Sequence, residues 1–401
     1  MNDLISVEEA QRLVVERAKP LASERVPMER AFGRVLAEEV TAGVDLPPFP
    51  SSAMDGYALR SSDTAGAPVS LVLAGSVAAG SPATRRLEAG EAMAISTGGV
   101  VPDGADAVVP VELTRTDDGT VRVEQPVPAG AHVRGRGGDV TAGTVVLERG
   151  VRLGAAQVGA LAAAGIAEIQ CAKRPRVGIL VTGSELRKPG DALGPGEIYE
   201  SNGLTLAAQL TSAGAVPAQL GVVPDDEEEH RKTMERALLG FDMLVTSGGA
   251  SVGPHDLVRK VQAQLRVDEV FWGVAVKPGK PVAFGMRREH PVFNLPGNPV
   301  SALVCFELFV RPAVAALQGI EAPLPVLSTG VLAAPVARGP NREEFVRARA
   351  EPTADGVRLH PVTGQESHMI VSAARADTLV RVPRGSGELA AGSDVRYLTL
   401  S

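Results

Sequence analysis

The sequence predicts an α/β and β multidomain fold, in which a central α/β domain is joined to β-rich domains. The length of 401 residues exceeds that of an ordinary single domain. Residues 175–321 alternate apolar strands with helices of about 12 to 15 residues, which is typical of a doubly wound, mainly parallel sheet. The flanking regions show short strand patterns between turn residues, in a chain with 44 glycines and 30 prolines.

Two separate stretches, residues 1–45 and 138–174, are expected to form one elongated N-terminal domain of helices and strands. Ser6 with Glu9 three residues later is a capping box, which predicts that the first helix begins here. A second short helix is expected from Pro27 to about Glu39. Residues 138–174 contain a strand pattern and an Ala-rich helix that we expect to pack back against the first stretch.

The intervening residues 46–137 are expected to form an inserted β-rich domain. Prolines at positions 47, 48 and 50 mark its first boundary, because proline fixes φ and removes a backbone donor. The Gly-rich stretch Gly135–Asp139 marks the second joint. The expected strands are Val69–Leu73, Ala92–Ile95, Ala107–Val111 and Val121–Val123.

The central domain, residues 175–321, is expected to bind ligands at the carboxyl ends of its strands, as open α/β sheets do. Asp225 stands in capping-box register with Glu228, which predicts a helix start. The tail, residues 322–401, returns to short strands and predicts a small C-terminal β-barrel or sandwich. The central domain's expected strands are Val177–Val181, Val216–Val223, Met243–Thr246, one near Val270–Val276 and Val292–Leu295, and its expected helices are Ser201–Ala213, one from Asp225, one from Asp256 and Pro299–Leu317.

Composition and charge narrow the class of protein. The formal charge of −7 argues against a general nucleic-acid-binding surface, but not against a local anion site. The two cysteines lack CxxC spacing, which indicates neither a disulfide framework nor a zinc site. The N-terminus is acidic and amphipathic rather than a signal peptide, and no apolar run is suited to spanning a bilayer. We expect a cytoplasmic protein with no nucleic-acid and no membrane partner.

Two loops that follow expected strands are suited to binding an oxyanion. The Gly-rich loop Thr246–Asp256 can turn several backbone N–H groups toward one anion, although it lacks the Gly-Lys-Ser/Thr of a Walker A loop. Its alternative is an ordinary tight turn. In the loop Lys277–Pro281, two prolines stiffen a backbone that carries the ammonium groups of Lys277 and Lys280, which suits a tetrahedral anion. Its alternative is a solvated turn.

A further loop, Leu295–Ser301, leads into the last helix of the central domain. Asn298 can cap this helix and Pro299 can be its first residue. We expect free N–H groups of this helix start, together with the Ser301 hydroxyl, to offer another anion site. Plain helix initiation is the alternative.

Carboxylates are expected at the same edge of the sheet. Asp225 and Asp256 each follow a strand and precede a helix, and Glu185 lies in the loop after the first strand. Helix N-capping is the alternative for each aspartate. Paired carboxylates beside a phosphate site are also the ligands that Mg²⁺ takes in proteins, so we expect a magnesium site here.

At these loops and beyond them the sequence resembles one enzyme family. The motifs span residues 54 to about 372 and are similar to those of the molybdopterin molybdenumtransferases, such as bacterial MoeA and the C-terminal domain of gephyrin. They are Met-Asp-Gly-Tyr-Ala at 54–58, Thr97-Gly98, Pro-Asp-Gly-Ala-Asp-Ala-Val-Val at 102–109, Gly-Asp-Val at 138–140, Thr-Gly-Ser-Glu-Leu at 182–186, Ser201-Asn202, Ser-Gly-Gly-Ala-Ser-Val-Gly at 247–253 with Asp256, Lys-Pro-Gly-Lys-Pro at 277–281, Leu-Pro-Gly-Asn-Pro-Val-Ser at 295–301, Arg-Glu-Glu-Phe-Val-Arg at 342–347 and Ser367-His368.

The resemblance implies a four-part subunit that works as a homodimer, with the active cleft between subunits. It implies Mg²⁺-dependent cleavage of adenylylated molybdopterin, release of AMP, and transfer of molybdenum from molybdate to the dithiolene sulfurs. Residues 175–321 would be the molybdopterin-binding domain. An adenylyltransferase that makes the adenylylated substrate is a candidate partner.

Matching motif positions assign roles to individual residues. The resemblance implies catalytic roles for Glu185, Asp225, Asp256 and Asp55, the first three also as magnesium ligands. Asp55 and Thr97 would reach the cleft from the partner subunit. Lys277, Lys280, Ser301 and Arg347 would hold molybdate or the pterin phosphate. The full set of implied substrate-binding residues is Thr97, Ser247, Gly248, Gly249, Ser251, Lys277, Lys280, Pro281, Pro296, Pro299, Ser301, Arg347 and Ser372.

One position departs from the family, and rival interpretations remain. The family usually has Asp in Thr-Gly-Asp-Glu-Leu, where this chain has Ser184. If that Asp is a metal ligand, this chain binds magnesium with one carboxylate fewer. A molybdopterin adenylyltransferase shares the α/β domain but lacks the additional domains. A scaffold protein, or a molybdate- or phosphate-binding protein without turnover, is the remaining alternative.

Overall fold

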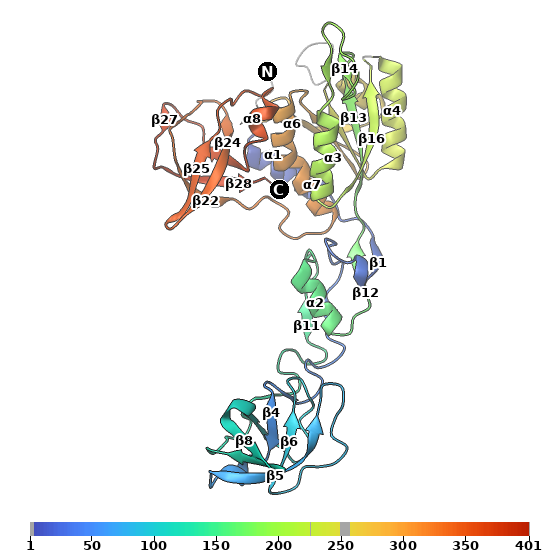
Figure 1. The fold of residues 1–401 in the computed structure, drawn as a ribbon. Coiled ribbons are helices and arrows are strands. Elements are labelled where there is room, and N and C mark those ends of the chain that lie inside the picture. The colour runs from blue at the N-terminus through green and yellow to red at the C-terminus, as the bar shows by residue number, and fades with distance from the viewer. Residues whose placement is uncertain (1–3, 225, 249–256, 401) are drawn as a thin grey trace.

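The protein is an elongated molecule with distinct bodies along its length (Figure 1). The computed structural model describes residues 4–224, 226–248 and 257–400. An α/β body and a C-terminal barrel lie side by side at one end, and an all-β body lies at the other end. A thin segment that contains helix α2 (Ala155–Ala163) joins the two ends. The α/β and β multidomain fold expected from the sequence is confirmed.

The α/β body is built on a mixed sheet with strand order β16-β13-β17-β21-β20-β18. The strands β16, β13, β17 and β21 are parallel, whereas β20 and β18 add an antiparallel edge. The mainly parallel sheet is thus confirmed, and β20 is a strand that the sequence patterns missed. Its strands are β13 (Arg176–Thr182), β16 (Val216–Val223), β17 (Met243–Ser247), β18 (Asp268–Trp272), β20 (Ala283–Arg287) and β21 (His290–Leu295).

Helices cover both faces of this sheet, which makes it doubly wound. Successive residues of a strand point to opposite faces, so Ile179 of β13 joins the core that includes α1, α3, α6 and α7. Leu180 joins the separate core beneath α4 and α5. The helices are α1 (Val7–Arg17), α3 (Asn202–Ser212), α4 (Glu227–Gly240), α5 (Leu257–Gln264), α6 (Pro299–Cys305) and α7 (Arg311–Leu317), the last two joined by a π-helical turn, Phe306–Val310.

The segment Pro299–Leu317 is the one stretch among the described residues that is long and apolar enough to cross a membrane. It is 83% buried inside the protein. Its apolar residues face the sheet and the helices around it, as Phe309 does at 0% exposure. It is therefore a core helix.

The N-terminal stretch and residues 138–174 pair through short strands. β1 (Ser23–Pro27) is antiparallel to β12 (Glu168–Ala172), and β2 (Val40–Thr41) pairs with β11 (Val145–Leu147). The expectation that the later stretch packs back on the earlier one is confirmed.

The second short helix expected from Pro27 to Glu39 is wrong. These residues, all of them described, contain a single 3-10 turn at Met28–Arg30. Gly33 follows with φ +74°, a left-handed conformation that interrupts a helix. Val35 and Leu36 then bridge to Arg152 and Cys171 in strand fashion. Val35 and Leu36 are therefore buried as part of an extended segment and do not form the apolar face of a helix.

The inserted body is a β-sheet with strand order β7-β4-β6-β5-β9-β8, and its expected strands are confirmed. At the point where the chain enters and leaves this body, β3 (Ser51–Ser52) pairs with β10 (Val133–Arg134). The sheet strands are β4 (Gly56–Leu59), β5 (Val69–Val77), β6 (Glu91–Ile95), β7 (Ala107–Pro110), β8 (Thr114–Asp117) and β9 (Thr120–Val123).

The C-terminal body is a closed barrel, one of the two forms that the sequence left open. It closes because β24 pairs with both β25 and β26, and β22 and β28 complete the ring. The short strand β19 (Val276–Lys277) leaves the α/β body and pairs with β24 of the barrel. The barrel strands are β22 (Ser328–Leu332), β24 (Glu343–Thr353), β25 (Gly356–Pro361), β26 (Thr378–Val382) and β28 (Asp394–Thr399).

Shorter elements complete the described part of the chain. They are the pair β14 (Leu186–Arg187) and β15 (Ile198–Tyr199), the pair β23 (Val336–Ala337) and β27 (Glu388–Leu389), and helix α8 (Ile370–Ala373).

Candidate functional site

A pocket of about 660 Å³ lies at the carboxyl ends of the parallel strands. The loops after β13, β17 and β21 meet there, together with the start of α3 and one residue of the barrel. The expectation that the loops share one edge of the sheet is confirmed for these three. It is wrong for the lysine loop Lys277–Pro281, which follows β19, a strand that pairs with the barrel, and does not line this pocket. The pocket is lined by Val181, Thr182, Gly183, Glu185, Leu186, Ile198, Tyr199, Glu200, Ser201, Asn202, Ser247, Gly248, Gly297, Asn298, Pro299 and His368.

One buried amide ties the loops of this pocket together. Asn202 Nδ2 donates to Ser247 Oγ at 2.8 Å and to the Gly297 carbonyl at 2.7 Å. Ser247 Oγ in turn donates to the Pro296 carbonyl at 3.2 Å. Ser247, which is 0% exposed, thus serves to hold the loops in place. The motif Ser201-Asn202 was visible in the sequence, but this contact was not predicted.

Glycine is required where the loops approach most closely. Gly248 has φ +89°, and a methyl group there would collide with the Thr182 carbonyl oxygen. Gly297 packs against the same glycine. The backbone of the predicted anion-binding loop therefore lies directly against the end of β13. Gly249 and Ser251 lie outside the described residues, so the rest of that loop remains a prediction.

Two carboxylates lie on the pocket wall. Glu185 is exposed, and its carboxylate lies over Gly183, where a methyl group would come within 2.6 Å of Glu185 Oε2. Glu200 is 9% exposed and its Oε1 accepts from the Gly203 N–H at 2.6 Å, at the start of α3. Asp225 and Asp256 lie outside the described residues. Within the described part of the chain, no cluster of three or more metal-ligating side chains occurs.

The start of α4 corrects the predicted helix cap. The Asp226 side chain accepts from the Glu229 N–H at 2.9 Å, so the cap lies one residue after the predicted pair of Asp225 and Glu228. Glu228 instead pairs with Arg231 and Lys232, and the hydrogen bonds from Arg231 and then Lys232 lower its pKa to about 2. The helix start thus has its cap without Asp225.

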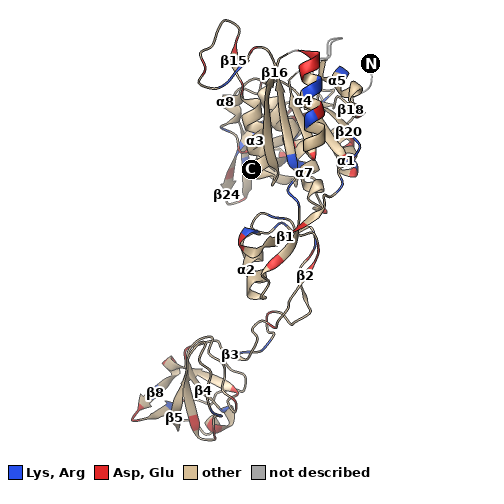
Figure 2. Ribbon diagram, turned by 90° about the vertical axis from the view of Figure 1, so that its right-hand side faces the viewer, with Lys and Arg blue, Asp and Glu red and all other residues tan. Residues whose placement is uncertain are grey.

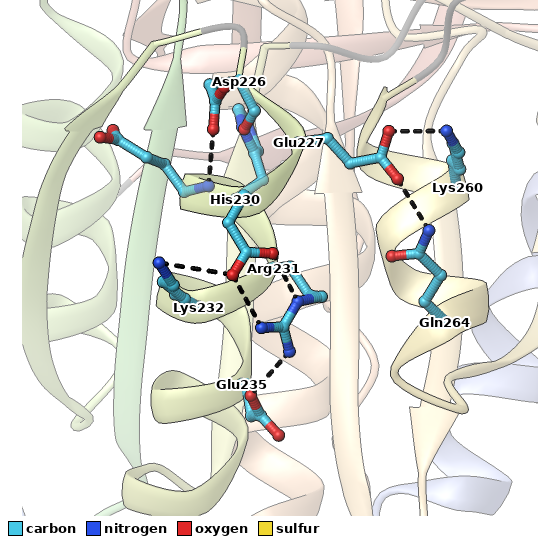
Figure 3. A network of polar contacts seen from close by, with 10 residues as sticks. Asp226, Glu227, His230, Arg231, Lys232, Glu235, Lys260 and Gln264 are labelled. Carbon is cyan, nitrogen blue, oxygen red and sulfur yellow. Dashed lines mark hydrogen bonds and ion pairs between the residues drawn. The ribbon is translucent and has the colours of Figure 1, made fainter.

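Acidic residues of the first turn of α4 make ion pairs on the outer surface of the helix. Figure 2 shows this acidic turn followed by basic residues. In Figure 3, Glu227 contacts Lys260 and Gln264 of α5, at 2.6 Å and 2.8 Å. These contacts join α4 to α5, and none of these residues lines the pocket.

The lysine loop packs against helix α6. Gly279 has φ +114°, and a methyl group there would collide with Cys305 Sγ, which donates to the Gly279 carbonyl. Burial raises the pKa of the Cys305 thiol. Lys277 and Lys280 are exposed, and Pro281 is half-buried. The Lys277 ammonium lies 3.0 Å from Glu344 Oε1 of the barrel strand β24.

The start of α6 differs in one respect from the expected anion site. Pro299 is its first residue, as predicted. The next N–H group, that of Val300, is not free: it donates to the Ser367 carbonyl at 3.0 Å. Ser301 is 4% exposed. The barrel loop therefore occupies part of the helix start and brings His368 to the pocket wall.

Arg347 lies inside the protein behind this loop. It is 1% exposed, and its Nη2 donates to the Gly364 carbonyl at 3.0 Å. Burial lowers its pKa, while Glu344 and Glu366 act in the opposite direction. Ser372 lies next to Gly364. The structure thus places Arg347 as a support of the loop that carries His368, and not among the residues that line the pocket.

Asp55 and Thr97, which the resemblance assigns to the same cleft, lie together. Asp55 Oδ1 accepts from the Thr97 N–H at 2.6 Å and from Thr97 Oγ1 at 3.0 Å. These two bonds, the backbone one foremost, lower the pKa of Asp55. Both residues belong to the inserted β body, at the opposite end of the molecule from the pocket (Figure 1). Within one chain they do not join the pocket residues.

Comparisons with known proteins cover nearly the whole chain. Models of the MoeA N-terminal region (domain I and II), a probable molybdopterin binding domain and the MoeA C-terminal region (domain IV) match residues 5–165, 178–316 and 329–400. Molybdopterin molybdenumtransferase 2 of Mycobacterium tuberculosis is 38% identical, over 99% of this chain and 100% of the relative. The molybdopterin molybdenumtransferase of Haemophilus influenzae is 34% identical, over 98% of each chain.

A solved structure agrees with these matches. The molybdopterin biosynthesis MoeA protein of Pyrococcus horikoshii superposes with a TM-score of 0.85 at 30% identity, over 99% of this chain and 100% of that one. The coverage extends from the N-terminal helix to the barrel, so the likeness is not confined to the α/β body. The chain belongs to the MoeA family of molybdopterin molybdenumtransferase enzymes.

Proposed function

We propose that this protein inserts molybdenum from molybdate into molybdopterin during molybdenum cofactor biosynthesis. In the same reaction, Mg²⁺-dependent cleavage of adenylylated molybdopterin releases AMP. One observation supports the proposal most strongly. Loops that follow neighbouring parallel strands form a polar pocket, and the chain matches enzymes named molybdopterin molybdenumtransferase over nearly their full length. The reaction is placed in the cytoplasm as part of the same proposal.

The pocket residues suit an anionic nucleotide-like substrate. Glu185, together with Asp225 and Asp256, would hold Mg²⁺, which would neutralise charge on the phosphates. The described residues fit a hard cation: Glu185 presents its carboxylate to the pocket, and the buried Thr182 Oγ1 beside it has no partner in the described part of the chain. Asn202 and Ser247 keep the loops around the phosphates in place.

The lysine loop suits molybdate. Molybdate is a tetrahedral dianion, and Lys277 and Lys280 offer exposed ammonium groups on a loop fixed against α6. Preorganised cations of this kind stabilise developing negative charge without rearrangement. No protein nucleophile is required, because an oxygen of molybdate or water can attack the phosphate.

We propose that the working unit is a homodimer. Asp55 and Thr97 adjoin β4 and β6 of the inserted β body, which lies at the other end of the molecule from the pocket (Figure 1). This separation supports a site in which they contribute to the pocket of a second copy. An adenylyltransferase is the proposed source of the adenylylated substrate.

Release of AMP from adenylylated molybdopterin tests the proposal. The purified protein is assayed with and without Mg²⁺ and molybdate, beside Asp256→Ala. We expect release that needs both ions and falls at least a hundredfold in the variant. Folded protein that releases no AMP under any of these conditions would overturn the proposal and leave a binding or scaffold protein.

A further inference from the structure

We propose that Glu344 is a positioning residue that sets the affinity of the lysine loop for its oxyanion. Its carboxylate holds the Lys277 ammonium in place and offsets part of its charge. The inference rests on the proposed function, since it takes the loop Lys277–Lys280 as the molybdate site. It assigns a role in that site to the barrel, which the sequence motifs alone did not give.

The contact is built into the pairing of two strands from different bodies. β19 pairs with β24 in parallel, with Lys277 opposite Glu344. Opposite charges at such positions attract across the strands. Lys277 Nζ lies 3.0 Å from Glu344 Oε1, and the two side chains are 50% and 13% exposed. A largely buried carboxylate thus holds a half-exposed ammonium.

The neighbouring glutamate points the other way. Glu343 contacts Arg381 at 2.5 Å, and Arg381 also contacts Glu8 of α1. Successive residues of a strand face opposite sides, so Glu343 fastens the barrel to the N-terminal helix while Glu344 faces the lysine loop. Glu344 is therefore a carboxylate that lies beside a lysine expected to bind an anion.

A carboxylate here has two opposing effects on a bound dianion. It restrains a flexible lysine, which favours binding, and it repels the dianion, which disfavours binding. The repulsion is the larger effect, because a half-exposed ammonium gains little from one ion pair, whereas a dianion bound at Lys277 carries two charges that the neighbouring carboxylate repels. The net result is a site that binds molybdate more weakly than it would without the carboxylate of Glu344.

Substitution at this position separates charge from packing. Glu344→Gln keeps an oxygen that accepts from Lys277 but removes the charge, so we expect the Kd for molybdate to fall roughly three- to tenfold, with a steeper salt dependence. Glu344→Asp keeps the charge, so its Kd stays within about twofold of wild type. Glu351→Gln is the matched control, since it removes another carboxylate of β24, one that contacts His360 of β25 and not the lysine loop.

Calorimetric titration of the full-length protein with sodium molybdate, at two ionic strengths, gives these values. Lys277→Ala is measured alongside and is expected to weaken binding. If Lys277→Ala weakens binding while Glu344→Gln binds as wild type or more weakly, the role of Glu344 is wrong and the lysine site stands. If Lys277→Ala binds as wild type, or wild type binds no molybdate, the assignment of the loop fails and the role of Glu344 fails with it. Release of AMP is scored separately.

Discussion

The side-chain amide of Asn202 joins two of the loops that form the pocket. It joins loops that follow different strands, with partners 45 and 95 positions away along the chain. A motif can mark such a residue but not its contacts, because these partners come together only once the sheet has formed. The same holds for Arg347, whose burial depends on which side of β24 it occupies.

Asn202→Asp is expected to lower the free energy of unfolding of the α/β body by about 1 to 3 kcal/mol. A carboxylate cannot donate to the Gly297 carbonyl, and the two groups repel each other. The sequence has a single tryptophan, Trp272 in β18, so its fluorescence during denaturant unfolding reports on this body. The exposed Asn341→Asp serves as control and should change stability by less than about 0.5 kcal/mol. Equal stability of the two variants would show that the hydrogen bonds of Asn202 do not stabilise this body.

At the scale of elements, most strands and helices follow from periodicity. The helix beginning after Ser6, the strand Val216–Val223 and the long core helix from Pro299 all lie where the patterns place them. The failures have local causes. The expected helix from Pro27 is interrupted at Gly33, and the apolar residues after it form an extended segment. Strand β20 was not predicted because Arg288, at φ +56°, makes the turn of its hairpin with β21, so no glycine marks the turn.

The cap of α4 gives a prediction that separates two roles for neighbouring aspartates. Asp226→Ala is expected to lower the free energy of unfolding by about 1 kcal/mol and to leave AMP release near the wild-type level. Asp226→Asn is expected to keep both the stability and the AMP release of the wild type, because asparagine also caps helices. Asp225→Ala is expected to keep stability within about 0.5 kcal/mol and to lower AMP release at least tenfold, since Asp226 caps the helix. Unfolding midpoints and AMP assays on the purified variants decide it. If Asp225→Ala lowered stability and kept AMP release, while Asp226→Ala lowered AMP release and kept stability, Asp225 would be the helix cap.

At the scale of the whole molecule, the sequence predicted four parts but not how they are placed. Their boundaries at residues 45, 137, 174 and 321 stay a prediction, although the sheets and the barrel fall between them. No local pattern indicates that β19 joins the barrel, or that Asp55 and Thr97 lie so far from the pocket. These placements depend on contacts between bodies, and the proposed dimer depends on a second chain.

Mixing two inactive variants tests the dimer. If each site combines Asp55 of one chain with Asp256 of the other, a mixed dimer of Asp55→Ala and Asp256→Ala has one intact site. After subunit exchange of equal amounts, random pairing restores roughly a quarter of wild-type AMP release. Asp256→Ala mixed with Lys277→Ala, both of which affect the α/β end, should restore none. A mixture of Asp55→Ala and Asp256→Ala that stays inactive despite verified exchange would place both residues at the site of one chain.

The decisive measurement for the proposed transferase activity is the molybdenum content of the pterin product. The protein is incubated with adenylylated molybdopterin, Mg²⁺ and molybdate, the pterin is separated, and its molybdenum is measured by mass spectrometry and by activation of an apoenzyme that needs the cofactor. We expect close to one molybdenum per AMP released, and none with Lys277→Ala combined with Lys280→Ala. AMP release without molybdenum on the pterin would contradict the proposed transferase activity and leave a hydrolase.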